Sequence, residues 1–233
     1  MTGAIDLLLF IVLPYAAAAV CVIATLERYT RHGFSVTSGS SQFLENRLHF
    51  WAMVPFHAGI LIVLLGHLVA FLIPRGVLAW NAVPWRLLVL EAAAFAGGLL
   101  ALGGFVAVIV RRLMQPALRR GTQRLDRAMY AVLVIQLATG VVLAVLYPWG
   151  SSWFAVAAAP YLWSLVLLQP DMTLVAAMPL LARAHIAGTW VLLALFAFSR
   201  LVHVIAVPNP YLWRAPQVVR WYRRSSVPAG RKS

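Results

Sequence analysis

Long apolar runs, separated by short polar or proline-rich stretches, dominate the hydrophobic pattern of this chain. Uninterrupted apolar segments of about 20 residues are typical of helices that cross a bilayer. Length and flanking charge predict five such helices, at about residues 3–26, 49–73, 87–110, 128–147 and 179–207. Prolines divide the apolar stretch 149–178 into pieces too short to cross. We therefore expect an all-α polytopic membrane protein with an interfacial or re-entrant helical segment between the fourth and fifth spans; a sixth crossing is the alternative.

Composition and charge fit this interpretation. Of the 233 residues 63% are hydrophobic and 11% charged, and the mean hydropathy is +0.86. A net charge of +13 is compatible with nucleic-acid binding, but the basic residues flank apolar runs that lack a polar face, so we expect no nucleic-acid partner. Most of the 19 Lys and Arg residues lie in the linkers 27–48 and 111–127 and in the tail. The positive-inside rule then places the N-terminus outside and the tail in the cytoplasm.

The predicted domain organisation is simple. Residues 1–207 form one membrane domain, and residues 208–233 form a basic cytoplasmic tail. The single cysteine, Cys21, lies within the first span. This chain alone therefore cannot build a disulfide framework or a Cys-ligated iron–sulfur cluster.

Four of the six histidines lie inside membrane-length apolar runs: His57 and His67 in the second span, His185 and His203 in the fifth. Imidazole nitrogens in hydrocarbon need a polar partner or a metal. The first pair is separated by roughly 15 Å of helical rise; the second by roughly 27 Å, or five whole turns, so both its members share one face. The two helices run in opposite directions. His67 is therefore paired with His185 toward the outside, and His57 with His203 toward the cytoplasm.

Two imidazoles from facing antiparallel helices can hold a haem iron between axial ligands, so the pattern predicts two stacked haem sites. The two rises differ by about 12 Å, which requires tilted or kinked helices. An interhelical hydrogen bond would explain any one of these histidines, but two depth-matched pairs favour haem. A metal-ion site is disfavoured because no carboxylate lies nearby. Gly59, Gly66 and Gly188 would give a flat porphyrin room or serve helix packing, and His32 and His49 are expected to be solvated.

Haem propionates need cations or hydrogen-bond donors near each bilayer surface. The candidates for the inner haem are Arg200, Arg111 and Arg112, and the candidate for the outer haem is Arg183. Interfacial anchoring is the alternative role, above all for Arg111 and Arg112.

Several motifs resemble a known family. FHAGILIVLLGHLVAF at 56–71, RAHIAGTWVLLALFAFSRLVHVIAVP at 183–208, SSQ at 40–42, FAGG at 95–98 and the arginine pair at 111–112 are similar to the gamma subunit of membrane-bound respiratory nitrate reductase, a di-haem cytochrome b. The resemblance implies a five-helix subunit of a bacterial or archaeal cytoplasmic membrane that oxidises menaquinol or ubiquinol. It also implies two haem b groups, the inner held by His57 and His203 and the outer by His67 and His185. Electrons would then pass to a cytoplasmic iron–sulfur beta subunit and a molybdenum alpha subunit that reduces nitrate.

One stretch departs from the family pattern. A member of the family carries a lysine shortly before FAGG, near the proposed quinol pocket, whereas this chain reads VPWRLLVLEAAAFAGG and has no lysine there. Arg86 and Glu91 are the candidate quinol-site residues in its place. An interfacial anchor at Arg86 and a helix-packing role for Glu91 are the alternatives.

No residue set in this chain can itself reduce nitrate, so the resemblance makes it the electron-transfer subunit of an enzyme complex. The arginine-rich linker and the tail YLWRAPQVVRWYRRSS are the expected docking surface for partner subunits; binding of anionic membrane lipid is the alternative. Three other functions stay open. The same module would serve another reductase or a nitrite- or sulfur-oxidising complex, the histidines would form a proton relay in a transporter, or the chain would be a purely structural anchor.

Overall fold

All regular elements of the described residues are helical. The structure, a computed structural model, describes residues 3–31, 47–120, 122–199 and 201. The elements in these ranges are α1 (Ala4–Leu7), the π-helix η1 (Leu8–Val12), α2 (Leu13–Arg31), α3 (Arg47–Leu72), α4 (Pro74–Asn81), α5 (Pro84–Met114), α6 (Pro116–Arg120), α7 (Arg124–Leu146), α8 (Gly150–Trp153), the π-helix η3 (Phe154–Ala158), α9 (Ala159–Val166), α10 (Met172–Ala176) and α11 (Leu180–Phe196). The all-α fold is thereby confirmed over this part of the chain.

Four helical segments are long and apolar enough to cross a membrane, by length and composition. They are Ala4–Arg31, Phe50–Leu72, Pro84–Met114 and Arg124–Leu146. These segments match the first four predicted spans, with ends displaced by a few residues. The fifth predicted span, 179–207, is described only in part: α11 has 17 residues, and residues 202–207 lie outside the described ranges. A polytopic membrane protein is supported, and the count of five spans stays a prediction.

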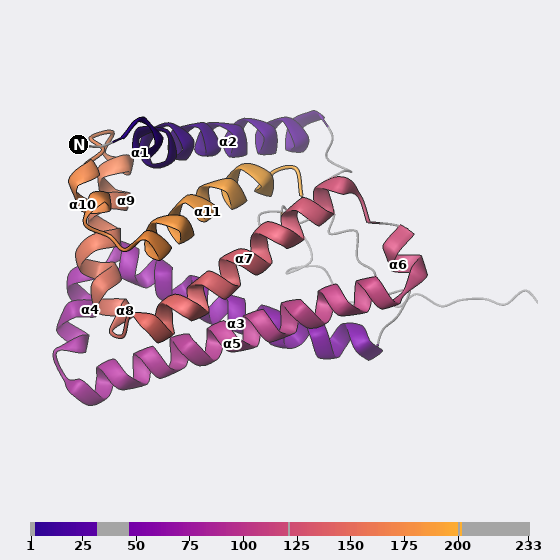
Figure 1. Ribbon diagram of the computed structural model, residues 1–233, viewed down its shortest axis with the longest axis horizontal. Coiled ribbons are helices and arrows are strands. Elements are labelled where there is room, and N and C mark those ends of the chain that lie inside the picture. Colours follow the sequence, from indigo (N-terminus) through magenta and orange to yellow (C-terminus); the bar gives the residue numbers. More distant parts are fainter. Residues whose placement is uncertain (1–2, 32–46, 121, 200, 202–233) are drawn as a thin grey trace, which may run out of the picture.

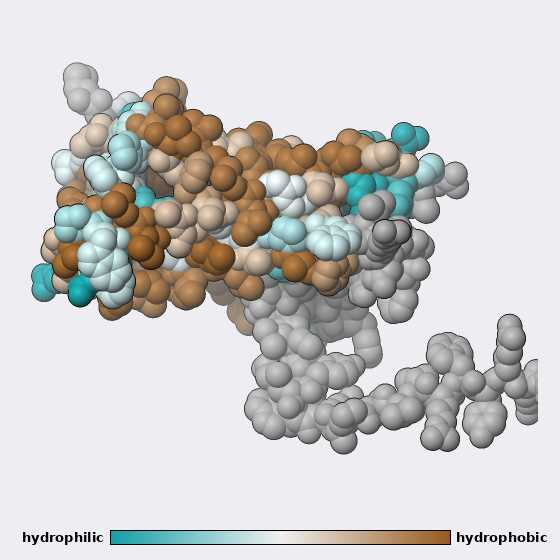
Figure 2. Space-filling model, turned by 90° about the horizontal axis from the view of Figure 1, so that it is seen from below, coloured by the Kyte–Doolittle hydropathy of each residue, from teal (hydrophilic) through white to brown (hydrophobic). Residues whose placement is uncertain are grey.

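The long helices lie side by side and alternate in direction (Figure 1). Close packing pairs α3 with α5, α5 with α7, and α11 with both α2 and α7. The short helices α4, α8, α9 and α10 gather at one end of the bundle, which we call the short-helix end, and α6 lies at the other, which we call the α6 end. Figure 2 shows apolar surface along most of the length of the bundle and hydrophilic atoms toward its two ends. This distribution is the one that a bilayer requires.

The segment after α7 crosses the short-helix end instead of continuing parallel to the long helices (Figure 1). Its helices α8, η3 and α9 follow one another without a break from Gly150 to Val166. Pro160 has no N–H, so the usual hydrogen bond to residue 156 cannot form, and the helix passes through a π-turn there. Trp163 ties this segment to α3, because its Nε1 donates to the Phe71 carbonyl at 2.8 Å and the two rings stack. The arrangement agrees with the predicted interfacial segment.

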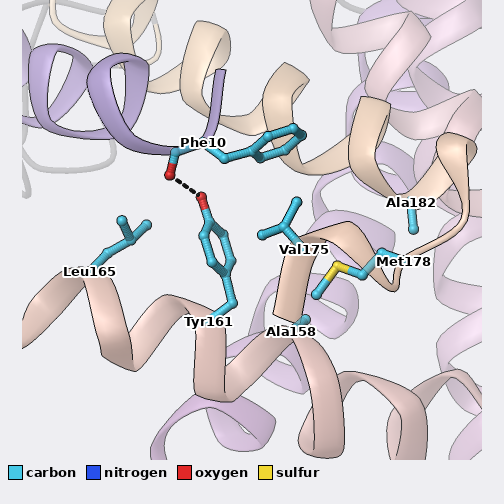
Figure 3. Close-up of a cluster of buried hydrophobic side chains, with 7 residues drawn as sticks. All are labelled: Phe10, Ala158, Tyr161, Leu165, Val175, Met178 and Ala182. Atoms are coloured by element: carbon cyan, nitrogen blue, oxygen red, sulfur yellow. Dashed lines mark hydrogen bonds between the residues drawn. The ribbon is translucent and has the colours of Figure 1, made fainter. Parts of the chain in front are cut away.

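A buried cluster joins the start of the chain to the short helices (Figure 3). Phe10, Tyr161 and Val175 are its largest fully buried side chains. The Phe10 carbonyl cannot accept the usual helical hydrogen bond from residue 14, because that residue is a proline. The Tyr161 hydroxyl donates to this carbonyl at 2.9 Å instead. The bond therefore satisfies a buried backbone acceptor and fixes the N-terminal helix against α9.

Glycines bring α3 and α5 into backbone contact. A Cβ added at Gly104 would lie 2.4 Å from the Phe56 backbone nitrogen, and one added at Gly59 would lie 2.3 Å from the Ala101 backbone nitrogen. Ala101 itself is fully buried in this interface. Gly59 therefore serves helix packing, which was one of the two roles that the sequence left open. Gly66 has open space where a Cβ would stand.

This interface yields a prediction for a matched pair of variants. Gly104→Ala forces a methyl group against the α3 backbone and should destabilise the protein by about 1–3 kcal/mol, because the two helices must separate. Gly103→Ala is the control, because a Cβ at the neighbouring position meets no atom within 4 Å. Thermal denaturation of the detergent-solubilised protein measures the difference. Equal melting temperatures for the two variants would contradict the close packing.

Candidate functional site

The described histidines of the predicted pairs lie on α3 and α11. His57 and His67 are on α3, and His185 is near the start of α11. His203 and Arg200 lie outside the described residues. The structure therefore describes both members of the predicted outer pair and one member of the inner pair.

Both α3 histidines hydrogen-bond the carbonyl one turn earlier on their own helix. Nδ1 of His57 lies 2.8 Å from the Met53 oxygen, and Nδ1 of His67 lies 2.8 Å from the Val63 oxygen. A carbonyl only accepts hydrogen bonds, so Nδ1 carries the proton and Nε2 carries the lone pair. Histidines that ligate metals commonly show this pattern, in which the second ring nitrogen donates to a carbonyl or a carboxylate.

His185 reaches the same tautomer through a neighbouring helix. Its Nδ1 lies 2.9 Å from Thr139 Oγ1 on α7. The single hydroxyl proton of Thr139 is directed at the Ile135 carbonyl, 2.8 Å away. The hydroxyl oxygen therefore accepts from Nδ1–H, and Nε2 of His185 carries the lone pair. His57, His67 and His185 thus all carry the proton on Nδ1 and the lone pair on Nε2.

His67 and His185 lie toward the same end of the bundle. His67 makes an edge-to-face contact with Phe154 of η3, with ring centroids 5.2 Å apart, and this places it next to the short-helix end. His185, near the start of α11, lies at the same end. In the described part of the chain α3 packs closely on α5, and α11 on α2 and α7, with no comparable interface between α3 and α11.

This donor set fits a haem better than a bare metal ion. No group of three or more His, Cys, Asp or Glu side chains that could hold a metal ion occurs within the described ranges. A structural zinc site takes four protein ligands, whereas a bis-histidine haem takes only two. Two Nε2 donors on helices that are not packed tightly together suit a flat macrocycle.

The arginines proposed for the propionates already have partners. Arg183 forms an ion pair with Asp6 of α1, and its guanidinium lies over the Phe10 ring, 5.4 Å from the centroid. At the α6 end, Arg112 donates to Thr122 Oγ1 at 3.0 Å and lies over the Tyr130 ring. Arg111 is buried on α5. Arg183 and the Arg111–Arg112 pair thus lie at opposite ends of the bundle, as the two predicted haems require.

Glu91 holds the start of α8. Its Oε1 accepts from the Ser151 backbone N–H at 2.8 Å and from the Ser151 hydroxyl at 2.6 Å. Asn81 of α4 donates to the same hydroxyl at 2.9 Å. The structure therefore shows the packing role for Glu91 that the sequence offered as an alternative, at the short-helix end where His67 and His185 also lie.

Arg86 is surrounded by aromatic rings near the start of α5. Its guanidinium lies 5.1 Å from the centroid of Trp80 and 5.6 Å from that of Trp85. Arginine over tryptophan is typical of an interfacial position, where the side chain has one apolar and one wet side. This environment agrees with the anchoring alternative and leaves the assignment to a quinol site a prediction.

Two α7 residues at this site, Thr139 and Gln136, escaped the sequence analysis. The only available signal was their polarity within the apolar span 128–147, since polar side chains inside a membrane helix usually face a partner. Which partner they face depends on the rotation of α7 against α11, and no motif encodes that rotation.

Fold and site together define a helical membrane protein in which His57, His67 and His185 are hydrogen-bonded through Nδ1 within the apolar helix bundle. The family described as nitrate reductase gamma subunit matches residues 6–222. The nitrate reductase gamma chain of Bacillus subtilis is 29% identical, over 90% of this chain and 95% of that protein. The respiratory nitrate reductase 1 gamma chain of Escherichia coli is 30% identical, over 93% and 97% respectively. The nitrate reductase-like protein NarX of Mycobacterium tuberculosis is 31% identical over 94% of this chain, which spans 34% of that larger protein.

This chain belongs to the nitrate reductase gamma subunit family. Membership makes it a membrane electron-transfer subunit of a respiratory nitrate reductase, which is an oxidoreductase complex. The gamma designation also implies further subunits in that complex. The resemblance read from the sequence motifs is thereby confirmed.

The Glu91 contacts predict how the start of α8 responds to substitution. Glu91→Leu removes both acceptor contacts and should destabilise this end by roughly 1.5–3 kcal/mol, the range for hydrogen bonds to a charged group. Glu91→Gln keeps an oxygen at the same reach and should retain much of the stability. Limited proteolysis around residues 147–151 and thermal denaturation report the effect. Glu27→Leu, at an exposed α2 position, is the control; a Glu91→Leu protein as resistant as this control would refute the role.

Proposed function

We propose that this chain oxidises a membrane quinol and carries the electrons through two haem b groups to cytoplasmic iron–sulfur and molybdenum subunits that reduce nitrate. The observation that carries the proposal is the shared tautomer of His57, His67 and His185, which gives each ring a lone pair on Nε2 inside membrane helices. Membership in the nitrate reductase gamma subunit family supports the same function.

The proposed ligand pairs follow from helix direction. His67 and His185 would hold the outer haem, because both lie toward the short-helix end. His57 lies ten residues earlier on α3, nearer the α6 end, and would hold the inner haem together with His203. When bound, the two haems would supply one-electron redox centres along the path between the two membrane surfaces.

The protein's own side chains would orient the propionates. Arg111 and Arg112 at the α6 end are the candidates for the inner haem, with Arg200 of the predicted fifth span. Arg183 is the candidate for the outer haem, and its ion pair with Asp6 would fix the guanidinium for that role.

Quinol oxidation is assigned to the short-helix end, beside the outer haem. Glu91 and Arg86 lie at this end and are the candidate polar contacts for menaquinol or ubiquinol. With the N-terminus outside, protons leave to the outside while electrons move inward. Each electron that crosses inward against a negative-inside potential stores about 2.3 kcal/mol per 100 mV.

The α6 end is the proposed docking face for the partner subunits. Arg112, Arg119 and Arg127 line a cavity of about 530 Å³ there, between α5, α6 and α7. The positive-inside rule assigns such a basic end to the cytoplasm of a bacterial or archaeal cell, where the beta and alpha subunits would bind. These arginines belong to the basic linker 111–127, whereas the tail 208–233 and most of the linker 27–48, which the sequence assigns to the same side, lie outside the described residues.

Alanine variants of the four histidines test the proposal. His67→Ala and His185→Ala should each remove the same haem, and His57→Ala and His203→Ala the other, so each variant should keep about half of the haem content. Reduced-minus-oxidised spectra with haem quantification measure this outcome. His32→Ala is the control, because the sequence places His32 in a solvated linker.

The same variants should lose quinol-driven nitrate reduction in membranes that contain the partner subunits. A soluble dye that reduces those subunits directly should still support nitrate reduction, because it bypasses this chain. A colourless wild-type protein would exclude the proposal and favour a histidine proton relay. Full quinol-driven activity in the His67→Ala variant would contradict the proposal and favour a purely structural anchoring role for this chain.

A further inference from the structure

Helix α7 contacts His185 through two polar side chains, Thr139 and Gln136. We propose that Thr139 and Gln136 are positioning residues for the outer haem, which hold His185 so that its Nε2 faces the iron. This inference rests on the proposed function, because it presupposes that His185 binds a haem. It adds to that function a second helix on which the outer haem depends.

Thr139 fixes the proton of His185 from outside its own helix. His57 and His67 donate Nδ1–H to the carbonyl one turn earlier on α3, so their orientation is set within one helix. Nδ1 of His185 lies 2.9 Å from Thr139 Oγ1, and the Thr139 hydroxyl donates a hydrogen bond to the Ile135 carbonyl. Two carbonyls, of Ile135 and Gln136, lie within reach of the Thr139 hydroxyl, so its proton goes to a carbonyl and its oxygen accepts from the ring.

Gln136 fixes the backbone at the same position. Its Nε2 lies 2.9 Å from the His185 carbonyl oxygen and 2.7 Å from Thr189 Oγ1. An amide nitrogen has two protons, so it donates to both acceptors at once. Thr189 Oγ1 also donates to the His185 carbonyl, at 3.1 Å. The ring and the backbone of His185 are thus both bonded to α7, one helical turn apart.

Glycines leave the room that these contacts need. A Cβ added at Gly140 would lie 3.2 Å from Cε1 of His185, and one added at Gly188 would lie 2.5 Å from Oε1 of Gln136. Gly140 therefore admits the imidazole against α7, and Gly188 admits the amide against α11. The sequence analysis offered Gly188 as space for a porphyrin, and the structure fills that space with Gln136.

The hydrogen bond at Nδ1 has an electronic consequence for a bound haem. When Nδ1–H donates a hydrogen bond, the lone pair on Nε2 binds iron more strongly, and this stabilises the oxidised iron. Removing the acceptor should raise the midpoint potential of the haem that His185 binds and weaken its retention roughly tenfold or more. Thr139 is bonded to His185 and not to His57, so the haem that His57 would hold should keep its potential.

The test compares Thr139→Val, Thr139→Ser and Thr30→Val in the intact complex. Valine matches threonine in shape and lacks the acceptor, whereas serine keeps it. Thr30 is the matched control, because its hydroxyl bonds the Leu26 carbonyl one turn earlier, at 2.8 Å, on an exposed face of α2. Redox titration of the haem absorption bands, the low-spin ferric resonance spectrum and haem content are measured. The absorption bands and ferric resonance that disappear in the His185→Ala variant are those of the outer haem.

The expected result is a more positive potential and an altered ferric resonance for the outer haem in Thr139→Val, with wild-type values in Thr139→Ser and Thr30→Val. Unchanged outer-haem signals in Thr139→Val would overturn this inference and leave the proposed function intact. Equal loss or shift of both haems would also overturn it, since general destabilisation would then be the cause. If the wild-type protein contained no haem, that result would contradict the proposed function itself.

Discussion

The hydrogen bond at Nδ1 of His57, His67 and His185 is the constraint on which the candidate site depends. Imidazole has two nitrogens, and in an apolar helix bundle neither can be left without a partner at low cost. His57 and His67 satisfy one nitrogen with a backbone carbonyl, and His185 does so with the Thr139 hydroxyl. Nδ1 of each ring is thereby fixed as a hydrogen-bond donor, and Nε2 carries the lone pair that the proposed function uses.

The main helix interfaces of the bundle are built by residues other than these histidines. Gly59 and Gly104 join α3 to α5 through backbone contact, so the side chains on the other face of α3 do not have to build that interface. Tyr161 fixes the N-terminal helix at the short-helix end, and Trp163 fixes the end of α3 there. The polar histidine positions are therefore supported by interfaces made elsewhere.

Much of the fold could be predicted from the sequence, because length and apolarity decide membrane helices. Pro116 separates α5 from α6, and the prolines after α7 mark the segment that crosses the short-helix end. The shared location of His67 and His185 followed from helix direction alone. The contacts of Thr139, Gln136 and Gly59 could not be predicted, because each depends on the rotation of one helix against another. The fifth span and the inner pair include residues outside the described ranges and stay predictions.

The packing pattern also bears on how such a protein would be assembled. Among the described residues, α3 is joined to α5 and α11 to α2 and α7, whereas α3 and α11 share no close interface. A macrocycle that entered between α3 and α11 would therefore not have to separate two closely packed helices. If the proposed haems bind there, they would bridge two helix groups that the polypeptide itself brings together mainly through α5 and α7.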